Sequence, residues 1–577
     1  MKKIKIISIL SVLVFLSVSC SDFLDKEPYT LTPETYFNNE TELETFLTGV
    51  YSPLMQEFFY GNYYPLYNAG GDDLTFYQRS SPATSILCAN ANSSNTYLNT
   101  FWKILYEGIN RANILLENVD NNTNISQATR DRIRGEALFL RAFYYFHLVE
   151  GWGDVPFRLK STKSVYGLDA ERTPKQIIYD QIIKDITTAI PYLYTSANIP
   201  YTGRVTQSAA KGILARIYLF RAGENNRDSE VGNPLTNTSD SILAYYRHAK
   251  QWALEVKESG LHGLVNPYKQ VFIDMCQDKY NSTGIRESIW EVEEAGNRST
   301  TEQAAGRIGN TLGFGSTNDY STVPAYQNLT GMANPGYSYK FAYASLKLYE
   351  MYESEGDTAR GDWSIANYEY TYDTNAPKAV TGRKYYYGKL PAGLTSVEGY
   401  PCTEEAASTS NKNKTRCAAK YRRELEVVTP KNKNYTPINF PILRYSDILL
   451  MIAEADNEIN ASPTELAYDC LDEVRNRAHI TPLKGSNLTK DQFREVIKKE
   501  RAMEFCFEAT RRWDLIRWGD FYKNMINMQG YVTKDAWSNN YKYAANYYQV
   551  SPAYNYYPIP DIETSVNKKI TKNNPGW

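Results

Sequence analysis

Apolar residues recur with the spacing of α-helices in two long blocks of this chain. In the first block, residues 41–260, the segment 135–148 carries an apolar stripe, and the glycines and proline of 151–156 end it. Further stretches with this spacing lie at 180–190, 206–217 and 243–257, and Thr206 occupies the N-cap position of the second. Paired helices of this size predict a stacked helical-hairpin array of the tetratricopeptide kind.

Helical spacing returns in the second block, and the stretch between the blocks is irregular. The second block predicts helices at 443–458, 464–478 and 491–507. Between 262 and 439 the periodicity weakens, and the only regular elements expected are strands at 288–292 and 384–387 and a helix at 344–352. Long irregular segments inside a compact protein usually serve function, so we expect the ligand there.

The amino terminus reads as a targeting leader. Lys2, Lys3 and Lys5 precede the apolar stretch 6–18, which is too short to span a bilayer comfortably, and Cys20 follows. Cleavage before Cys20 and acylation of its thiol are expected, which ties a folded protein to a membrane by lipid. Among the residues before Cys20, Leu16 lies one position earlier than in the usual lipoprotein signal. The alternative is therefore an ordinary secretory signal whose last residue is cysteine.

Charge and composition argue against nucleic-acid binding and metal chemistry as functions of this protein. Removal of the leader, with three lysines and no acids, leaves 60 basic and 65 acidic residues and a formal charge of -5. This balance argues against nucleic acid as a partner, and 4 histidines leave little room for metal chemistry. The 49 tyrosines are in excess, and aromatic rings suit both protein interfaces and the C–H faces of sugars.

The cysteines beyond the leader form no C-x-x-C pair, which argues against a zinc or thioredoxin-type site. Cys470 and Cys506 fall in helical patterns and are expected to be buried thiols. Cys402 and Cys417 flank a polar stretch that has few apolar side chains with which to form a core. A disulfide between these two in an oxidising compartment is a hypothesis.

Carboxylates recur every four residues near the end of the second block. Glu500, Glu504 and Glu508 would share one helix face with Arg512, and like charges stacked in this way repel. We expect Arg501, Arg511 and Arg512 to neutralise them. The ladder is therefore interpreted as a structural ion network that orients helices, not as a catalytic acid and base.

Taken together, several segments resemble the SusD/RagB family of nutrient-binding outer-membrane lipoproteins. They lie at Cys20–Asp25, 141–156, 439–454, 500–519, 557–560 and 574–576, and their order and spacing are more specific than any one of them. The resemblance implies a mostly α fold with tetratricopeptide-like helix pairs and an irregular binding region. It divides the chain into a signal peptide (1–19), an N-terminal helical region (20–260) and a C-terminal region (261–577). The last contains the loop-rich insert 261–440, and both regions pack as one globular unit.

The resemblance also implies function. Such proteins capture oligosaccharide or polysaccharide on the outward face of the outer membrane and deliver it to a SusC-like TonB-dependent barrel. No catalysis, cofactor or metal is implied. By analogy of position, the binding surface is expected at 70–79 and 308–339. The stacking candidates are Tyr77, Phe314, Tyr320, Tyr326 and Tyr337, and the hydrogen-bonding candidates are Asp73, Arg79, Asn310 and Asn318.

Two rival functions stay open at this point. A secreted glycoside hydrolase would also be aromatic-rich, and Glu291, Glu293 and Glu294 are its nominal carboxylates, although the alternation at 289–293 predicts a strand with one wet face. A binder of the same family with peptide or another polymer as cargo is the second rival.

The sequence carries no H-E-x-x-H, G-x-S-x-G or P-loop motif, and His147 is expected to be a packed core histidine.

Overall fold

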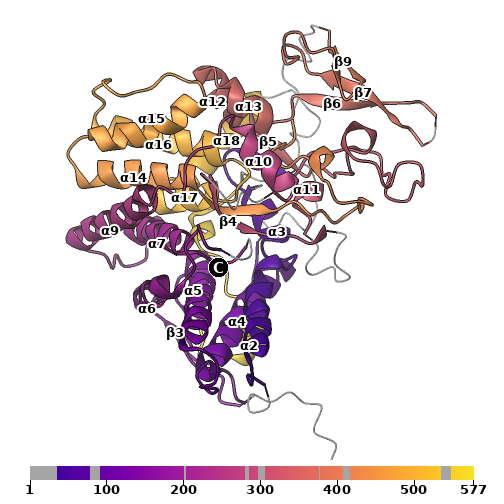
Figure 1. The fold of residues 1–577 in the computed structure, drawn as a ribbon. Coiled ribbons are helices and arrows are strands. Elements are labelled where there is room, and N and C mark those ends of the chain that lie inside the picture. Colours follow the sequence, from indigo (N-terminus) through magenta and orange to yellow (C-terminus); the bar gives the residue numbers. More distant parts are fainter. Residues whose placement is uncertain are drawn as a thin grey trace, which may run out of the picture.

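The computed structural model describes residues 36–69, 71–77, 91–164, 166–199, 203–279, 285–296, 306–375, 377–406, 416–534 and 548–577. Three features expected from the sequence lie outside these ranges: the leader, the lipidation candidate Cys20 and the hydrogen-bonding candidate Arg79. The described part is mostly helical, which confirms the predicted fold class (Figure 1). Among the described residues, no helix is both long and apolar enough to cross a bilayer.

The amino-terminal helices form the lower part of the molecule in Figure 1. They are α2 (Glu40–Tyr51), α3 (Tyr63–Ala69), α4 (Thr96–Asn118), α5 (Gln127–Trp152), α6 (Lys175–Ala189), α7 (Gln207–Ala222), α8 (Glu224–Val231) and α9 (Ser239–Glu258). Consecutive helices pack as pairs, α4 with α5 and α5 with α6, and α7 packs with α9 across the short α8. The helical-hairpin scaffold expected from the apolar spacing is therefore present.

The second block completes the scaffold. Its helices are α14 (Tyr445–Ile459), α15 (Glu465–Arg477), α16 (Lys490–Phe505), α17 (Arg511–Trp518), α18 (Phe521–Lys534) and the short α20 (Asp561–Val566). Helix α14 packs against α9, α15 and α16 and thereby joins the two blocks. In the carboxyl-terminal tail, α20 begins directly after Pro560.

Side-chain caps explain where several helices begin. The Thr206 hydroxyl accepts a hydrogen bond from the Ala209 amide at the start of α7, as the sequence predicts. Thr489 and Gln492 form a reciprocal capping box at the start of α16. At the junction of α7 and α8, a Cβ on Gly223 would lie 2.2 Å from the carbonyl oxygen of Arg517. Only glycine allows α17 to approach so closely there.

The middle of the chain adds short helices and small sheets. The helices are α10 (Lys269–Cys276), α11 (Ile308–Thr311), α12 (Leu346–Glu355) and α13 (Thr358–Ser364). Three two-stranded sheets pair β1 (Thr75–Tyr77) with β5 (Ala342–Ala344), β2 (Val155–Pro156) with β3 (Arg172–Thr173), and β4 (Ser288–Val292) with β10 (Phe440–Arg444). A four-stranded sheet contains β6 (Tyr368–Tyr372), β7 (Val380–Tyr385), β9 (Tyr400–Glu404) and β8 (Ser396–Val397), in that order. This sheet projects at the upper right of Figure 1.

The strand at 288–292 forms where it was predicted, but its expected wet face was wrong. Strand β4 pairs with β10, and the Glu291 side chain is buried with 6% of its surface exposed. The Asn439 amide donates a hydrogen bond to Glu291 Oε2 at 3.1 Å. Burial raises the pKa of Glu291 to about 7. The alternation in the sequence therefore marks two buried faces.

One large hydrophobic cluster runs through the helical scaffold, and a smaller one fills the projecting lobe. The large cluster includes residues from Phe37 to Ile570 and so draws on both helical blocks. The smaller cluster lies under the four-stranded sheet and includes Phe314, Tyr320 and Tyr368. This second core gives the irregular middle region packing of its own.

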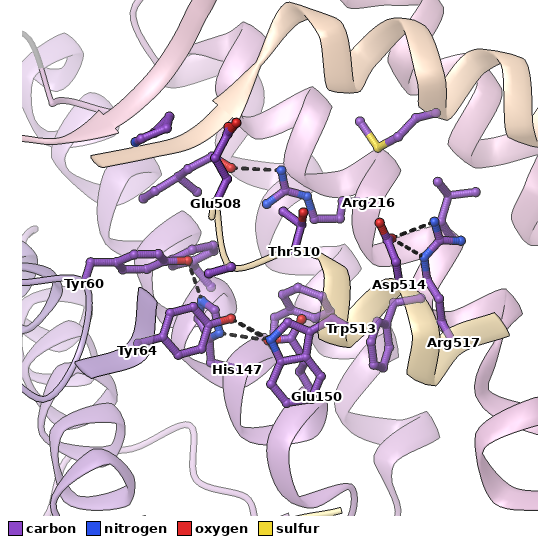
Figure 2. Close-up of a pocket in the computed structure, with 18 of the residues that line it drawn as sticks. Tyr60, Tyr64, His147, Glu150, Arg216, Glu508, Thr510, Trp513, Asp514 and Arg517 are labelled. Atoms are coloured by element: carbon purple, nitrogen blue, oxygen red, sulfur yellow. Dashed lines mark hydrogen bonds and ion pairs between the residues drawn. The ribbon is translucent and has the colours of Figure 1, made fainter. Parts of the chain in front are cut away.

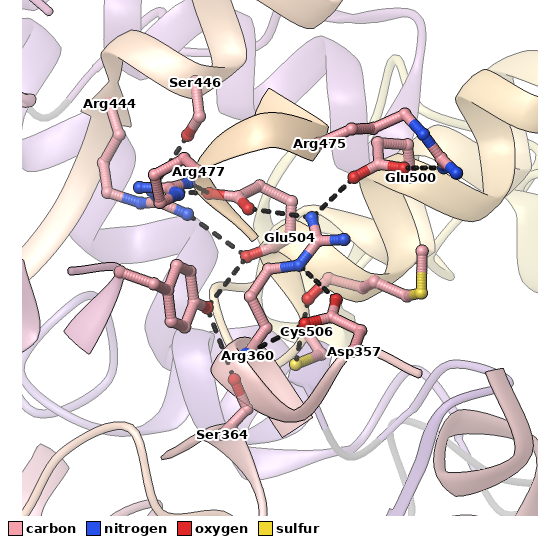
Figure 3. A network of polar contacts seen from close by, with 12 residues as sticks. Asp357, Arg360, Ser364, Arg444, Ser446, Arg475, Arg477, Glu500, Glu504 and Cys506 are labelled. Carbon is pink, nitrogen blue, oxygen red and sulfur yellow. Dashed lines mark hydrogen bonds and ion pairs between the residues drawn. The ribbon is translucent and has the colours of Figure 1, made fainter. Parts of the chain in front are cut away.

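The carboxylate ladder is a buried ion network, as expected, but its cationic partners differ from those predicted (Figure 3). Glu504 accepts hydrogen bonds from Arg360, Arg444 and Arg477, and Glu500 accepts from Arg360 and Arg475. Glu508 lies beyond the end of α16 and pairs with Lys420 and Arg444.

The three arginines expected to neutralise the ladder have other environments. Arg501 pairs with Asp447 and Asp514, and Arg511 pairs with Asp73. The buried Arg512 forms no ion pair with any described carboxylate and lies over the Phe521 ring at 4.5 Å. Helix periodicity could not reveal partners from distant segments, because packing between elements sets them.

A buried histidine makes stability depend on pH. His262 is 5% exposed, its Nε2 lies 3.1 Å from Ser196 Oγ, and burial lowers its pKa to about 4. An unfolded histidine titrates at about 6.5, so between pH 4 and 6.5 the unfolded chain binds more protons than the folded one. This residue is therefore expected to remove up to about 3 kcal/mol of stability as the pH falls from 6.5 to 4.

The variant His262→Gln isolates this contribution, since glutamine does not titrate. Denaturant unfolding of both proteins at pH 7 and pH 4.5 is expected to show a larger loss on acidification in the wild type. Equal losses in the two proteins would mean that His262 is as easily protonated in the folded chain as in the unfolded one.

Candidate functional site

A row of aromatic rings lies along residues 337–341, in the region where the sequence places the ligand. Tyr77 stacks on Phe341 with ring centroids 5.1 Å apart, and Phe341 stacks on Tyr339 at 5.0 Å with an angle of 9° between the planes. Tyr339 meets Tyr337 edge to face at 4.9 Å. The rings of Tyr337, Tyr339 and Phe341 are partly exposed, whereas Tyr77 is buried. We call these four residues the aromatic row.

The backbone of the aromatic row is held by buried polar groups. The amide of Tyr339 donates to the carbonyl oxygen of Asn310 at 2.8 Å, and the Asn310 side chain donates to the carbonyl oxygen of Tyr337 at 3.3 Å. The guanidinium of Arg423, which is fully buried, donates to the carbonyl oxygens of Tyr337 and Lys433. Rings on a backbone fixed in this way are preorganised for stacking, because little conformational entropy is left to lose on binding.

Two polar side chains border the aromatic row. The Lys433 ammonium lies over the Tyr337 ring, 5.1 Å from its centroid, and pairs with Asp319 at 3.3 Å. The Tyr339 hydroxyl lies 3.5 Å from Asn434 Oδ1. The aromatic row therefore combines flat apolar faces with an amide, a hydroxyl and a charged group, which is a combination that holds polyhydroxylated ligands.

Three of the predicted stacking residues, Tyr77, Phe314 and Tyr320, are buried, so that prediction was wrong for them. Phe314 is 1% exposed and packs against Tyr368 and Tyr370 in the smaller cluster. Tyr320 is also 1% exposed, and its hydroxyl donates to the carbonyl oxygen of Lys378 at 2.8 Å. A ring that solvent does not reach cannot stack on a ligand. Phe314 and Tyr320 are core residues of the projecting lobe, whereas Tyr77 belongs to the large cluster and supports the aromatic row by stacking on Phe341.

Tyr326 and Asn318 lie beside this core and are partly exposed. The Tyr326 ring packs on Tyr320 with centroids 5.4 Å apart. The Asn318 side chain lies 3.5 Å from the carbonyl oxygen of Lys378. Neither contacts the four rings of the aromatic row through any hydrogen bond or ring contact that the described residues form.

Asp73 and Asn310 were predicted to hydrogen-bond a ligand, and the structure corrects both roles. Asp73 is fully buried and pairs with Arg511 at 2.8 Å and with Lys347 at 2.5 Å. Burial alone would raise its pKa, but these two cations hold the pKa of Asp73 far below its usual range. Asn310 is fully buried as well and positions the aromatic row from beneath.

The sequence analysis missed Tyr339, Phe341, Lys433 and Asn434. A signal for the first two was present, because aromatic residues alternate with other types at positions 337, 339, 341 and 343. An extended segment places such positions on one side. Lys433 and Asn434 gave no local signal, since they meet the aromatic row only through the tertiary fold.

A cavity of about 40 Å³ lies inside the helical scaffold, among α5, α7 and α17 (Figure 2). His147 contacts Glu150 Oε2 through Nδ1 at 3.1 Å and the Tyr60 hydroxyl through Nε2 at 3.2 Å. The Trp513 indole donates to the Tyr64 hydroxyl at 3.0 Å. This space suits a few water molecules and is far below the volume of a ligand site. His147 is a packed core histidine, as predicted.

The predicted disulfide between Cys402 and Cys417 is absent, and both thiols are free. Cys402 lies opposite Arg383 in the pairing of β7 with β9. Cys417 forms a backbone bridge with Tyr343, and burial raises the pKa of its thiol. The ends of the intervening stretch are thus held by backbone pairing to two different elements, and no covalent link is needed to fix them.

Comparison with known families covers most of the chain. Residues 286–577 match the model of the SusD family. Residues 22–219 match a model described as starch-binding associating with outer membrane. A curated relative is the SusD-like protein P25 of Formosa agariphila, 26% identical over 545 residues, with 90% of each chain covered.

Solved structures share the fold. A SusD homolog from Bacteroides thetaiotaomicron superposes with a TM-score of 0.74 at 24% identity, covering 94% of this chain and 98% of that one. A structure described as a laminarin binding SusD-like protein gives a TM-score of 0.63 at 20% identity, covering 94% and 100%. Since the family model alone matches more than half of the residues, and the helical scaffold agrees, this chain belongs to the SusD family.

Proposed function

We propose that this protein binds oligosaccharide or polysaccharide on the aromatic row and does not alter it chemically. The observation that carries the proposal is the continuous ring contact from Tyr77 to Tyr337 on a backbone fixed by Asn310 and Arg423. Stacked sugar faces each contribute modestly, so that capture at several points stays reversible. Reversible capture suits a protein that passes its ligand on.

Of the three carboxylates considered for a hydrolase, only Glu293 is partly exposed, which supports a role without catalysis. Glu291 and Glu294 are 6% and 1% exposed. Hydrolysis of a glycosidic bond needs two carboxyl groups that the sugar and a water molecule can reach. Buried carboxyl groups on and beside a paired strand do not offer that access. This burial favours binding over hydrolysis.

The names of similar proteins support the same class of ligand. One structural neighbour is described as laminarin binding, and another as a surface glycan-binding protein from Bacteroides uniformis. The model that matches residues 22–219 is described as starch-binding associating with outer membrane. We therefore infer a surface location on the outer membrane and delivery of the glycan to a SusC-like TonB-dependent transporter.

A polysaccharide panel tests the proposed function. Affinity electrophoresis of the mature chain through gels that each contain one polysaccharide is expected to show retardation by at least one of them. Retardation by none, together with binding to peptides, would favour the rival binder of peptide. Release of reducing sugar by the purified protein, lost in Glu291→Gln, would show that the protein is a hydrolase.

The lipid anchor gives a separate prediction. The variant Cys20→Ala is expected to abolish labelling by radioactive palmitate and retention at the cell surface, because the acylated thiol is the proposed attachment. Glycan affinity of the purified variant is expected to equal that of the wild type. Palmitate incorporation that persists in the variant would place the lipid elsewhere and contradict the proposed anchor.

A further inference from the structure

A surface hollow lies on the helical scaffold, and the elements that line it are different from those that carry the aromatic row. It has a volume of about 550 Å³ and is lined by α4, by residues from 156–162 and 166–169, and by α20 with the following Asn567. Sites for small ligands commonly have volumes of about 300–1,000 Å³. We call this hollow the α4 groove. Its lining includes Asn110, Arg158, Lys160 and Tyr166.

The wall of the α4 groove is fixed by hydrogen bonds to α4. Glu117 accepts from both the amide and the hydroxyl of Ser161, at 2.9 and 2.6 Å. Asn110 Oδ1 accepts from the Thr162 amide at 2.8 Å, and the Asn113 side chain donates to the carbonyl oxygen of Lys160 at 3.2 Å. A wall anchored at several points keeps its shape without ligand, which lowers the entropic cost of binding.

An exposed ring stands at this wall. The Tyr166 side chain is 85% exposed, more than any other large apolar side chain among the described residues. Isolated exposed apolar groups are common on proteins, but this ring lines a hollow of ligand size. Its flat face can stack on a sugar while its hydroxyl stays in water.

Polar groups with free hydrogen-bonding capacity surround this ring. Within the described ranges, Arg158 and Lys160 form no ion pair and Asn110 Nδ2 donates no hydrogen bond, while one N–H group of Arg158 donates to the carbonyl oxygen of Leu168. The acidic residues that line the groove are Asp169, which accepts from the Lys568 amide, and Glu563, which accepts from the Trp102 indole and the Asn567 side chain. Cationic donors and anionic acceptors around an aromatic ring can hydrogen-bond the hydroxyl groups of a neutral saccharide.

A protein interface is the competing interpretation, because Leu168 and Val566 also line the groove and are 41% and 70% exposed. The centres of protein interfaces are depleted in charged residues, whereas four charged side chains line this hollow. The composition therefore favours a small polar ligand. We propose that the α4 groove is a second saccharide-binding site, an inference that rests on the proposed function.

Two sites on one protein have a measurable consequence. A long polysaccharide that reaches both the aromatic row and the α4 groove binds more tightly than either site alone allows, because the second contact is intramolecular. A short oligosaccharide contacts one site at a time. Loss of the α4 groove should therefore weaken binding of the polymer and leave binding of a short oligosaccharide at the aromatic row unchanged.

Affinity electrophoresis with a polysaccharide that retards the wild-type mature chain tests this inference. Tyr166→Ala is expected to weaken binding of the polymer by about three- to tenfold. Tyr192→Ala is the matched control, because Tyr192 is 41% exposed and does not line the groove. Tyr339→Ala is expected to retain residual retardation that the double variant with Tyr166→Ala loses. Hydrogen exchange is expected to slow in residues 157–169 when the polymer is added.

Three results would overturn the inference. If Tyr166→Ala and Tyr192→Ala both bind the polymer as the wild type does, the α4 groove is no saccharide site, although the proposed function stands. If Tyr166→Ala keeps its affinity for the polymer but no longer copurifies with a membrane barrel, the groove is a protein interface. If no polysaccharide retards the wild type, the proposed function fails and the inference fails with it.

Discussion

Replacing Glu504 by glutamine is expected to destabilise the protein by about 3–5 kcal/mol. The Glu504 carboxylate is fully buried and accepts hydrogen bonds from Arg477 at 2.6 Å, Arg444 at 3.0 Å and Arg360 at 3.1 Å (Figure 3). Burial alone would raise its pKa, but these arginines hold the pKa of Glu504 well below its usual range. A neutral amide would remove the one carboxylate that all three buried arginines share, and the carboxylates that remain, such as Glu500 and Glu287, would not fully compensate their charge.

Glu495→Gln on the same helix is the matched control. Its side chain is 70% exposed and pairs with Lys498 at 2.9 Å. Loss of an exposed pair costs at most about 1 kcal/mol. Urea unfolding of the three proteins measures both effects as shifts of the transition midpoint. Equal shifts for the two variants would show that the buried network contributes no more than a surface ion pair.

Replacing Tyr339 by alanine is expected to weaken glycan binding about tenfold or more, which corresponds to at least about 1.4 kcal/mol. Tyr339 occupies the centre of the aromatic row, stacked on Phe341 and edge to face with Tyr337. Its removal takes away one stacking face and breaks the ring contact between Tyr337 and Phe341, while Phe341 still stacks on the buried Tyr77. Calorimetric titration with a saccharide selected from the panel measures the change.

Two further variants separate affinity from stability. Tyr320→Ala removes a ring buried in the projecting lobe and is expected to lower the unfolding midpoint while the folded protein keeps its affinity. Tyr387→Ala, at an exposed ring outside the aromatic row, is expected to change neither quantity. If Tyr320→Ala lost affinity while Tyr339→Ala kept it, the binding surface would be the one expected from the sequence.

Local patterns in the sequence were sufficient to predict the scaffold. Helices α7 and α15 begin directly after their threonine caps, Thr206 and Thr464. The apolar stripe at 443–458 lies within one or two residues of the bounds of α14. Strand β4 forms over the predicted residues. These elements depend on periodicity and on capping groups a few residues away, which a single sequence displays.

Burial in the irregular region depends on contacts between distant segments. Phe314 and Tyr320 have the residue type of a stacking platform, but the strands at 368–385 cover them. Asp73 has the residue type of a ligand donor, but Arg511 meets it from a segment 438 positions later in the chain. The residues near Phe314, Tyr320 and Asp73 in the sequence do not indicate these partners. The alternation from Tyr337 to Tyr343 was the one local signal of the aromatic row.

The crystal structure of the mature chain with a saccharide that retards it would test the binding site most directly. We predict a sugar ring stacked on Tyr339 or Phe341, with hydroxyl groups within hydrogen-bonding distance of Lys433 or Asn434. A saccharide that is bound only elsewhere, with solvent over the aromatic row, would contradict the proposal that this row is the glycan site.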